Sequence, residues 1–162
     1  YRLDPSDGDG YSTSRGTFDT TRPNGLLFSL DHQSLFVAQS GREPEEKREL
    51  REYPVNSDVS LGKYRLLHDF GPHRGIDGMV LDTDGNIIAT AGFEQSGPGP
   101  MIYVFSPSGN VLETHPLPVD RPTNCSFGGP DMRTLYVTTS GGHLFKTSTE
   151  HTGRLAYPPA RG

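Results

Sequence analysis

Apolar and polar positions along residues 75–92 follow the pattern of a β-hairpin. Two short apolar runs, 79–81 and 87–89, are separated by Asp84-Gly85, a dipeptide that favours the positive φ angles of a tight hairpin turn. Asp77 stands just before the first run, where neither the turn nor a hydrophobic core requires an acidic residue. The pattern therefore predicts a hairpin and marks Asp77 as a candidate for chemistry.

The same plan occurs three times along the chain: a polar residue, an apolar strand, an Asp-containing turn and a second apolar strand. The three copies place Asn24, Asp77 and Asn124 in equivalent positions, which are 53 and 47 residues apart. These intervals are close to the period of about 40–50 residues that propeller blades show. The repeat therefore indicates a β-propeller.

Between successive hairpins the chain has room for two more strands, which gives the four strands of a propeller blade. The additional strands are expected at residues 49–56, 63–70, 101–106 and 111–117. No window of ten or more residues keeps apolar positions at helical spacing, so no helix is expected. The predicted fold class is all-β, with about three four-stranded blades over residues 22–70, 75–117 and 121–147.

Composition narrows the functional classes. The chain has 20 Gly, 14 Pro and 31% hydrophobic residues, which favours short strands and turns. Its net charge is -5 with scattered Lys and Arg, so nucleic acid is excluded as a partner. No apolar run approaches the roughly 20 residues that cross a bilayer, so a soluble protein without a membrane partner is expected, either cytoplasmic or periplasmic. The lone cysteine, Cys125, lies in an apolar strand and is expected to be a buried structural thiol.

Three blades are fewer than the four that a closed propeller needs, and open sheet edges expose unpaired backbone groups. We therefore expect residues 1–162 to be the C-terminal part of a single larger propeller domain whose upstream blades are missing. A second chain that completes the ring is the alternative. Residues 1–5 read as the end of a strand, followed by a turn, which favours the first interpretation.

In a propeller, the innermost strand of every blade begins on the same face of the ring. Asn24, Asp77 and Asn124 are therefore expected to converge at the mouth of the central channel. One carboxylate and one or two amides form an all-oxygen site that suits a hard divalent cation and leaves positions for water or substrate. For Asn24 the alternative is turn chemistry, because Pro23-Asn24-Gly25 also suits a tight turn.

Loops at residues 41–48, 92–100 and 141–142 should rim the same face, and the hairpin turns at 31–32, 84–85 and 131–132 should lie on the opposite face. The charged run 42–51 is expected to be a solvated rim loop, with a substrate lid as the alternative. Residues 97–100 read as a stiff loop, and His73 as a residue of ordinary loop packing that could instead reach the mouth.

At these motifs the sequence resembles the senescence marker protein (regucalcin) and gluconolactonase family. The resemblance rests on Pro23-Asn24-Gly25, on Asp77-Gly78-Met79, and on Pro122-Thr123-Asn124 followed by Phe127-Gly128-Gly129. It implies a six-bladed propeller that hydrolyses sugar lactones with a divalent metal cation in its channel. Calcium is the first expectation for the ion, with magnesium, manganese and zinc as alternatives. The resemblance also implies that Asn24 and Asp77 are metal ligands and that Asp77 is the catalytic general base or proton shuttle.

The family's remaining metal ligand is a glutamate near the start of the protein, and its sugar-contacting residues precede the Pro-Asn-Gly motif. Both would lie upstream of Tyr1, so the chain corresponds to the C-terminal half and holds only part of the site. Asn124 is expected to line the channel without binding the ion. The expected partner is a small-molecule sugar lactone. The alternative function is a non-enzymatic propeller that binds a cation or a partner on its loop face.

Overall fold

In the computed structural model, which describes residues 1–8 and 10–155, the chain is built from β-strands, turns and loops, with no helix in those residues. None of the described segments is therefore a helix able to span a membrane. The strands are β1 (Arg2–Pro5), β2 (Tyr11–Ser14), β3 (Pro23–Phe28), β4 (Ser34–Ser40), β5 (Arg48–Pro54), β6 (Arg65–Asp69), β7 (Ile76–Leu81), β8 (Ile87–Phe93), β9 (Ser96–Phe105), β10 (Val111–Pro116), β11 (Pro122–Gly128), β12 (Thr134–Thr139) and β13 (Leu144–Ser148).

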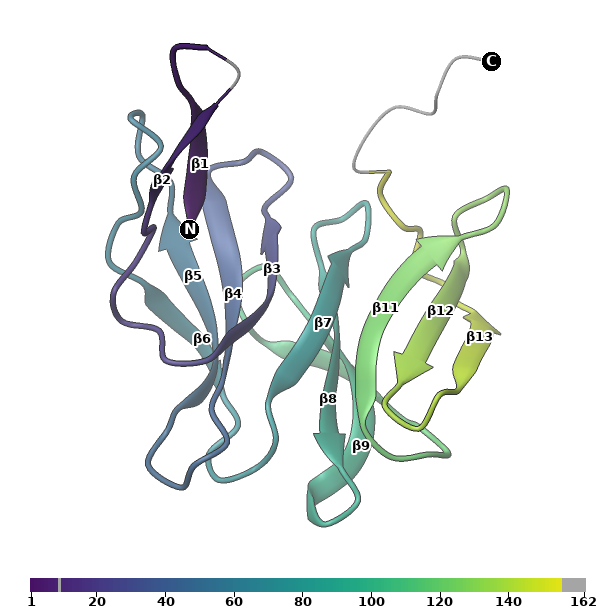
Figure 1. The fold of residues 1–162 in the computed structure, drawn as a ribbon. Coiled ribbons are helices and arrows are strands. Elements are labelled where there is room, and N and C mark those ends of the chain that lie inside the picture. Colours follow the sequence, from purple (N-terminus) through teal and green to yellow (C-terminus); the bar gives the residue numbers. More distant parts are fainter. Residues whose placement is uncertain (9, 156–162) are drawn as a thin grey trace.

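Three antiparallel sheets follow one another along the chain, each with its strands in sequence order (Figure 1). Blade 1 comprises β3–β6, blade 2 comprises β7–β10 and blade 3 comprises β11–β13, while β1 and β2 form a separate hairpin. The innermost strand β7 lies between the innermost strands β3 and β11. The predicted all-β fold made of propeller blades is confirmed, although blade 3 has three strands within the described residues where the other two have four.

Blade 2 forms the centre of the core because both of its faces are buried. Alternate residues of β8, such as Ile87 and Ala89, pack with Phe36 and Leu50 of blade 1. The intervening residue Ile88 packs against blade 3. A strand that is buried on both faces has no polar side, which explains the continuous apolar run that marked this hairpin in the sequence.

The hairpin turns repeat with the same geometry. His32, Gly85 and Met132 occupy equivalent turn positions, and all three have positive φ, at 60°, 83° and 56°. In blade 2 the turn is longer than the two-residue turn expected for Asp84-Gly85, because Asp82 N donates to Asn86 O across 3.1 Å. The buried Asp82 carboxylate accepts the backbone N–H groups of Asp84 and Asn86 and so stabilises this longer loop.

Residues 97–100 are part of strand β9, so the prediction of a stiff loop was wrong. The strand begins at Ser96, directly opposite Phe93. A Cβ on Gly92 would collide with the carbonyl oxygen of Gly99, and Gly92 has a φ of 77°. The glycines allow β8 and β9 to approach closely around a bulge, which proline and glycine content alone does not reveal.

The prediction that the charged run 42–51 is a solvated loop was only partly correct. Residues 42–47 form a loop, but β5 begins at Arg48, and Arg48, Glu49 and Arg51 are buried. An ion pair of 2.6 Å joins Arg51 to Glu49, and the Arg51 guanidinium stacks on the ring of Tyr64. Charged residues that neutralise one another inside the fold look like a solvated run in the sequence, which is why the prediction missed them.

Candidate functional site

Each innermost strand carries a register shift at its polar motif. In β3 the shift lies between Pro23 and Leu26, in β7 between Ile76 and Met79, and in β11 between Pro122 and Asn124. β-Bulges re-aim side chains and are frequent beside functional sites. The three bulges repeat at equivalent places, so the polar residues predicted from the sequence lie where the backbone departs from regular pairing.

Asn24 and Asp77 come together in the structure. The Asn24 side-chain amide Nδ2 donates a hydrogen bond to Oδ1 of Asp77, across the boundary between blade 1 and blade 2. Asn24 is exposed, and the Asp77 side chain is 22% exposed, so both can reach a ligand. Asn24 lies within β3, so the alternative of a tight turn at Pro23-Asn24-Gly25 is wrong.

Arg74 holds the other oxygen of the Asp77 carboxylate. Its Nη2 pairs with Oδ2 of Asp77, while its Nη1 donates to the carbonyl oxygens of Gly92 at 2.9 Å and Pro122 at 3.2 Å. One guanidinium therefore ties the candidate base to blade 2 and blade 3. Each Asp77 oxygen has one hydrogen-bond donor and keeps a free lone pair for another partner.

The motif glycines are required because the innermost strands approach closely. A Cβ on Gly25 would lie 2.5 Å from the carbonyl oxygen of Asp77, and a Cβ on Gly78 would lie 2.7 Å from Cα of Asn124. Neither glycine has a positive φ, so space and not backbone conformation excludes a side chain. Asn124 packs against Gly78, and its Oδ1 accepts the N–H of Cys125 at 2.9 Å.

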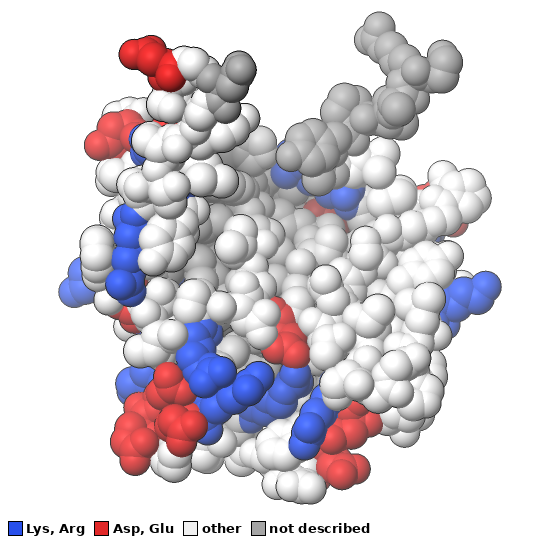
Figure 2. Space-filling model, in the orientation of Figure 1, with Lys and Arg blue, Asp and Glu red and all other residues white. Residues whose placement is uncertain are grey.

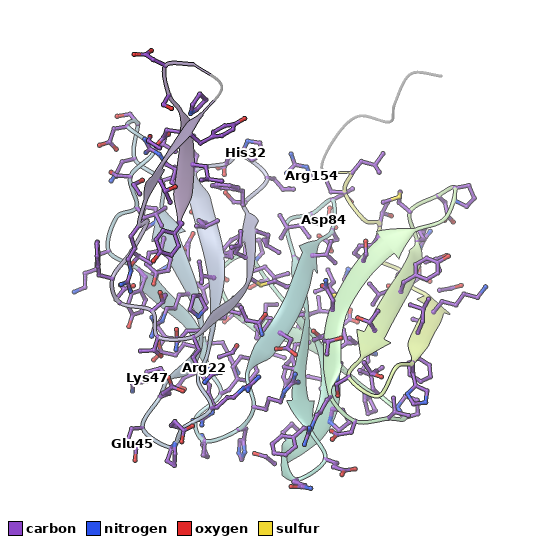
Figure 3. All side chains as sticks on the ribbon, in the orientation of Figure 1. Arg22, His32, Glu45, Lys47, Asp84 and Arg154 are labelled. Atoms are coloured by element: carbon purple, nitrogen blue, oxygen red, sulfur yellow. The ribbon has the colours of Figure 1, made fainter. Side chains whose placement is uncertain are left out.

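A groove of about 1290 Å³ opens beside the starts of the innermost strands, at the end of the molecule that is called the mouth below. Both Asn24 and Asp77 line it. Arg22 lies at the same end of the molecule as Glu45 and Lys47, whereas His32 and Asp84 of the hairpin turns lie at the opposite end (Figure 3). The arrangement of the two faces agrees with the expectation from the sequence. The groove is lined by the loop between β4 and β5, by Phe93 and Ser96 at the turn between β8 and β9, and by the segments that precede β3, β7 and β11.

Arginines are the residues that the sequence analysis missed. Arg22, Arg74 and Arg121 occupy equivalent positions before the three innermost strands, because the carbonyl oxygen of each accepts the N–H at the end of the second strand of its blade. All three line the groove, together with Arg42 and Arg48. The Arg-Pro pairs at the start of β3 and β11 were the signal that could have revealed Arg22 and Arg121, whereas Arg74 has no such signal.

Two other candidates have structural roles. His73 Nδ1 lies 2.9 Å from the Ser96 hydroxyl, so His73 fastens the loop before β7 to the start of β9. Cys125 is buried, and burial raises the pKa of its thiol to about 12. A thiol with so high a pKa is not a nucleophile, as expected.

In the part of the chain that the structure describes, no group of three or more His, Cys, Asp and Glu could hold a metal ion.

Successive antiparallel blades whose innermost strands begin at one polar groove are the architecture of a propeller-type protein. Comparison with known proteins shows the family. Residues 1–141 match the SMP-30/gluconolactonase/LRE-like region. Regucalcin of Xenopus laevis is 33% identical over 118 residues, covering 72% of this chain and 37% of that protein. The 6-deoxy-6-sulfogluconolactonase of Pseudomonas putida is 36% identical over 124 residues, covering 75% of this chain and 39% of that protein. The chain therefore belongs to the SMP-30/gluconolactonase/LRE-like family.

Solved structures agree with this assignment. A luciferin-regenerating enzyme superposes with a TM-score of 0.71 at 26% identity, covering 84% of this chain and 48% of that structure. A gluconolactonase from Xanthomonas campestris superposes with a TM-score of 0.65 at 30% identity, covering 85% of this chain and 41% of that structure. The chain thus spans less than half of the length of the relatives it matches.

Proposed function

We propose that this chain carries part of the active site of a sugar-lactone hydrolase, in which Asp77 accepts a proton from the attacking water. The observation that carries the proposal is the contact between Asn24 and Asp77, which joins an amide and a carboxylate from two blades at the mouth of one groove. The gluconolactonase names of the Pseudomonas and Xanthomonas relatives support the same reaction class.

The reaction is the addition of water to the lactone carbonyl carbon, followed by cleavage of the ring C–O bond to give a carboxylate, a hydroxyl group and a proton. Asp77 is held from two sides by Asn24 and Arg74, so its remaining lone pairs have a fixed direction. A fixed carboxylate can orient a water molecule and accept its proton, and such general-base assistance contributes about 10²–10⁴-fold in rate. Asn24 orients Asp77 and reaches the groove itself.

A divalent cation fits this pair as part of a larger ligand set. The Asp77 carboxylate and the Asn24 amide offer oxygen donors, which calcium and magnesium prefer, and a rotation of the amide turns its oxygen toward the ion. Two residues are too few to complete a site, so other ligands are required. When bound, such a cation polarises the lactone carbonyl. We propose calcium as the ion, with magnesium, manganese or zinc as alternatives.

We also propose that the three blades are the C-terminal half of one six-bladed ring. Support comes from the length of the relatives, since this chain covers 37% to 48% of those compared above. Further blades would supply the remaining ligands and the sugar contacts.

Substitution of Asp77 tests the proposed reaction. In the full-length protein, Asp77→Asn keeps the size of the side chain but removes its ability to accept a proton. We expect kcat/KM for gluconolactone with added calcium to fall at least about 100-fold, with an unchanged melting temperature. Asp84→Asn, at the opposite end of the molecule, is the matched control and should retain full activity. Retained turnover in Asp77→Asn would contradict the proposal and favour a non-enzymatic binding protein.

A further inference from the structure

The groove at the mouth is basic although the chain as a whole is acidic. Five arginines line it against two carboxylates, Glu46 and Asp77, and Asp120 pairs with Arg121 beside it, which leaves a formal excess of two positive charges. The whole chain has a net charge of -5. Figure 2 shows Lys and Arg side chains gathered at the end of the molecule where β3 and β7 begin, flanked by acidic side chains. A cationic groove in an anionic protein concentrates anions.

Arg48 contributes a buried positive charge beside this groove. Its side chain is held by three backbone carbonyl oxygens: those of Glu46 at 3.0 Å, Arg42 at 3.1 Å and Glu43 at 2.8 Å. Among the described residues no carboxylate forms an ion pair with it, although the residue is only 8% exposed. Backbone carbonyls satisfy the donors without neutralising the charge, so its field extends into the groove.

Arg121 is fixed in a strained conformation at the groove. Its φ is 53°, in the left-handed region that disfavours residues with a Cβ. The Asp120 carboxylate accepts its backbone N–H at 2.8 Å and pairs with its Nε at 3.3 Å, and its guanidinium lies 5.7 Å from the ring centroid of Phe93. Strain of this kind is concentrated at functional sites. Glycine would adopt this backbone conformation without strain, so an arginine at this position indicates a role for its side chain.

Arg22 and Arg42 complete the basic lining from blade 1. Both are exposed, and neither guanidinium forms a hydrogen bond or ion pair within residues 1–8 and 10–155. Glu46, a carboxylate in the same loop as Arg42, accepts the backbone N–H groups of Arg42 and Glu43, which lower its pKa. Glu46 is therefore ionised and offsets one charge, while the guanidinium donors of Arg22 and Arg42 remain available to a ligand.

We propose that the substrate of this groove is an anionic lactone, one that carries a carboxylate, sulfonate or phosphate group away from the ring ester. This inference rests on the proposed lactone hydrolysis and specifies its substrate class. The ester lies at Asp77, and the anionic group lies against Arg22 and Arg121, whose planar guanidinium groups suit carboxylate and tetrahedral oxyanions. A cation held at Asp77 would carry the same sign of charge as the arginines and would add to the preference.

A matched pair of lactones tests the inference in the full-length protein. Gluconolactone is neutral, and the corresponding glucarolactone differs in bearing a carboxylate at the far end of the sugar. With calcium present we expect kcat/KM for the anionic lactone to exceed that for the neutral one by about tenfold, the size of one charge-assisted hydrogen bond. Phosphorylated gluconolactone, tested in parallel, distinguishes a carboxylate site from a tetrahedral-oxyanion site. The preference should decrease as ionic strength rises.

Three variants locate the effect. Arg22→Gln and Arg121→Gly should each lower the anionic-to-neutral ratio of kcat/KM by about threefold, because the two arginines share the tenfold preference. Arg121→Gly also relieves the left-handed backbone, so its melting temperature should equal or exceed that of the wild type, which separates loss of binding from loss of folding. Lys63→Gln removes one exposed positive charge outside the groove and should leave the ratio unchanged.

Equal turnover of both lactones by the wild type, or a ratio that survives in both arginine variants, would overturn the anionic substrate while leaving lactone hydrolysis intact. Absence of turnover with every lactone would overturn both. A ratio that falls equally in Lys63→Gln would show a general effect of net charge and would also overturn the inference.

Discussion

At the scale of single residues, the Asp77 carboxylate is the point where the Asn24 amide and the Arg74 guanidinium meet. Asn24 and Asp77 interrupt an apolar repeat at equivalent positions, so their register was visible without coordinates. Arg74 occurs in no comparable motif. Its ion pair with Asp77 is local, three residues along the chain, but its contact with Pro122 depends on how blade 2 and blade 3 pack. Contacts between blades are set by tertiary structure, which residue patterns within one repeat do not describe.

The glycine beside Asn24 provides a prediction at this scale. In Gly25→Ala the new Cβ would meet the carbonyl oxygen of Asp77 at 2.5 Å and force β3 and β7 apart. We expect a loss of about 1–3 kcal/mol in the free energy of unfolding, typical of overpacking, together with a fall in the proposed turnover of lactones. Chemical denaturation measures the first effect. Gly16→Ala, whose Cβ would meet its nearest neighbour at 3.6 Å, is the control, and equal stability of the two variants would contradict the close approach.

His68 provides a prediction about pH. Burial beside Phe70 and Phe105 lowers its pKa from the ordinary value of 6.5, against a smaller opposing effect of Asp69. Between the lowered folded pKa and 6.5, the unfolded chain binds more protons than the folded chain, so the free energy of unfolding rises with pH through that window. Stability should therefore fall as the pH decreases below 6.5.

Urea denaturation of the wild type and of His68→Phe, at pH values on both sides of that window, measures the effect. The substitution keeps an aromatic ring in the cluster but removes the titrating group, so the pH dependence should become smaller. An identical dependence in both proteins would show that His68 does not contribute.

At the scale of elements, the strands were predicted well because each blade repeats one hydrophobic pattern. The strand expected at 111–117 is observed at Val111–Pro116, and that expected at 63–70 is observed at Arg65–Asp69. The errors lie where local composition is misleading. Ser96–Phe105 forms a strand through a Gly-Pro segment, and β5 begins with buried charges that the sequence presents as a polar run.

The hairpin turns give the prediction at the element scale. Gly85 has a φ of 83°, whereas the equivalent His32 holds a similar conformation with a side chain. A Cβ at Gly85 would meet nothing closer than 3.4 Å, so Gly85→Ala tests backbone conformation without a clash. We expect a loss of about 1–2 kcal/mol in unfolding free energy, the cost of a left-handed L-residue. His32→Gly should not lower stability, and the same loss in both variants, measured by thermal denaturation, would contradict the shared turn geometry.

At the scale of the whole molecule, the blade architecture followed from the repeat, but the distribution of charge did not. The scattered Lys and Arg of the sequence gave no indication of a basic face, yet five arginines converge on the groove that contains Asp77. Equivalent positions in successive blades meet at one mouth, so residues about fifty positions apart become neighbours. A propeller therefore brings residues of a weak sequence repeat together at one site. For this reason composition alone did not predict the positive charge of the groove.

The central claim is that Asn24 and Asp77 act on one ligand, and calorimetric titration of calcium into the full-length protein tests it most directly. The wild type and Asp84→Asn should bind the ion with the same affinity. Asn24→Leu and Asp77→Asn should each weaken binding by at least about tenfold, because the first removes an oxygen ligand and the second removes the negative charge of the carboxylate ligand. Equal calcium affinity in all four proteins would contradict the account.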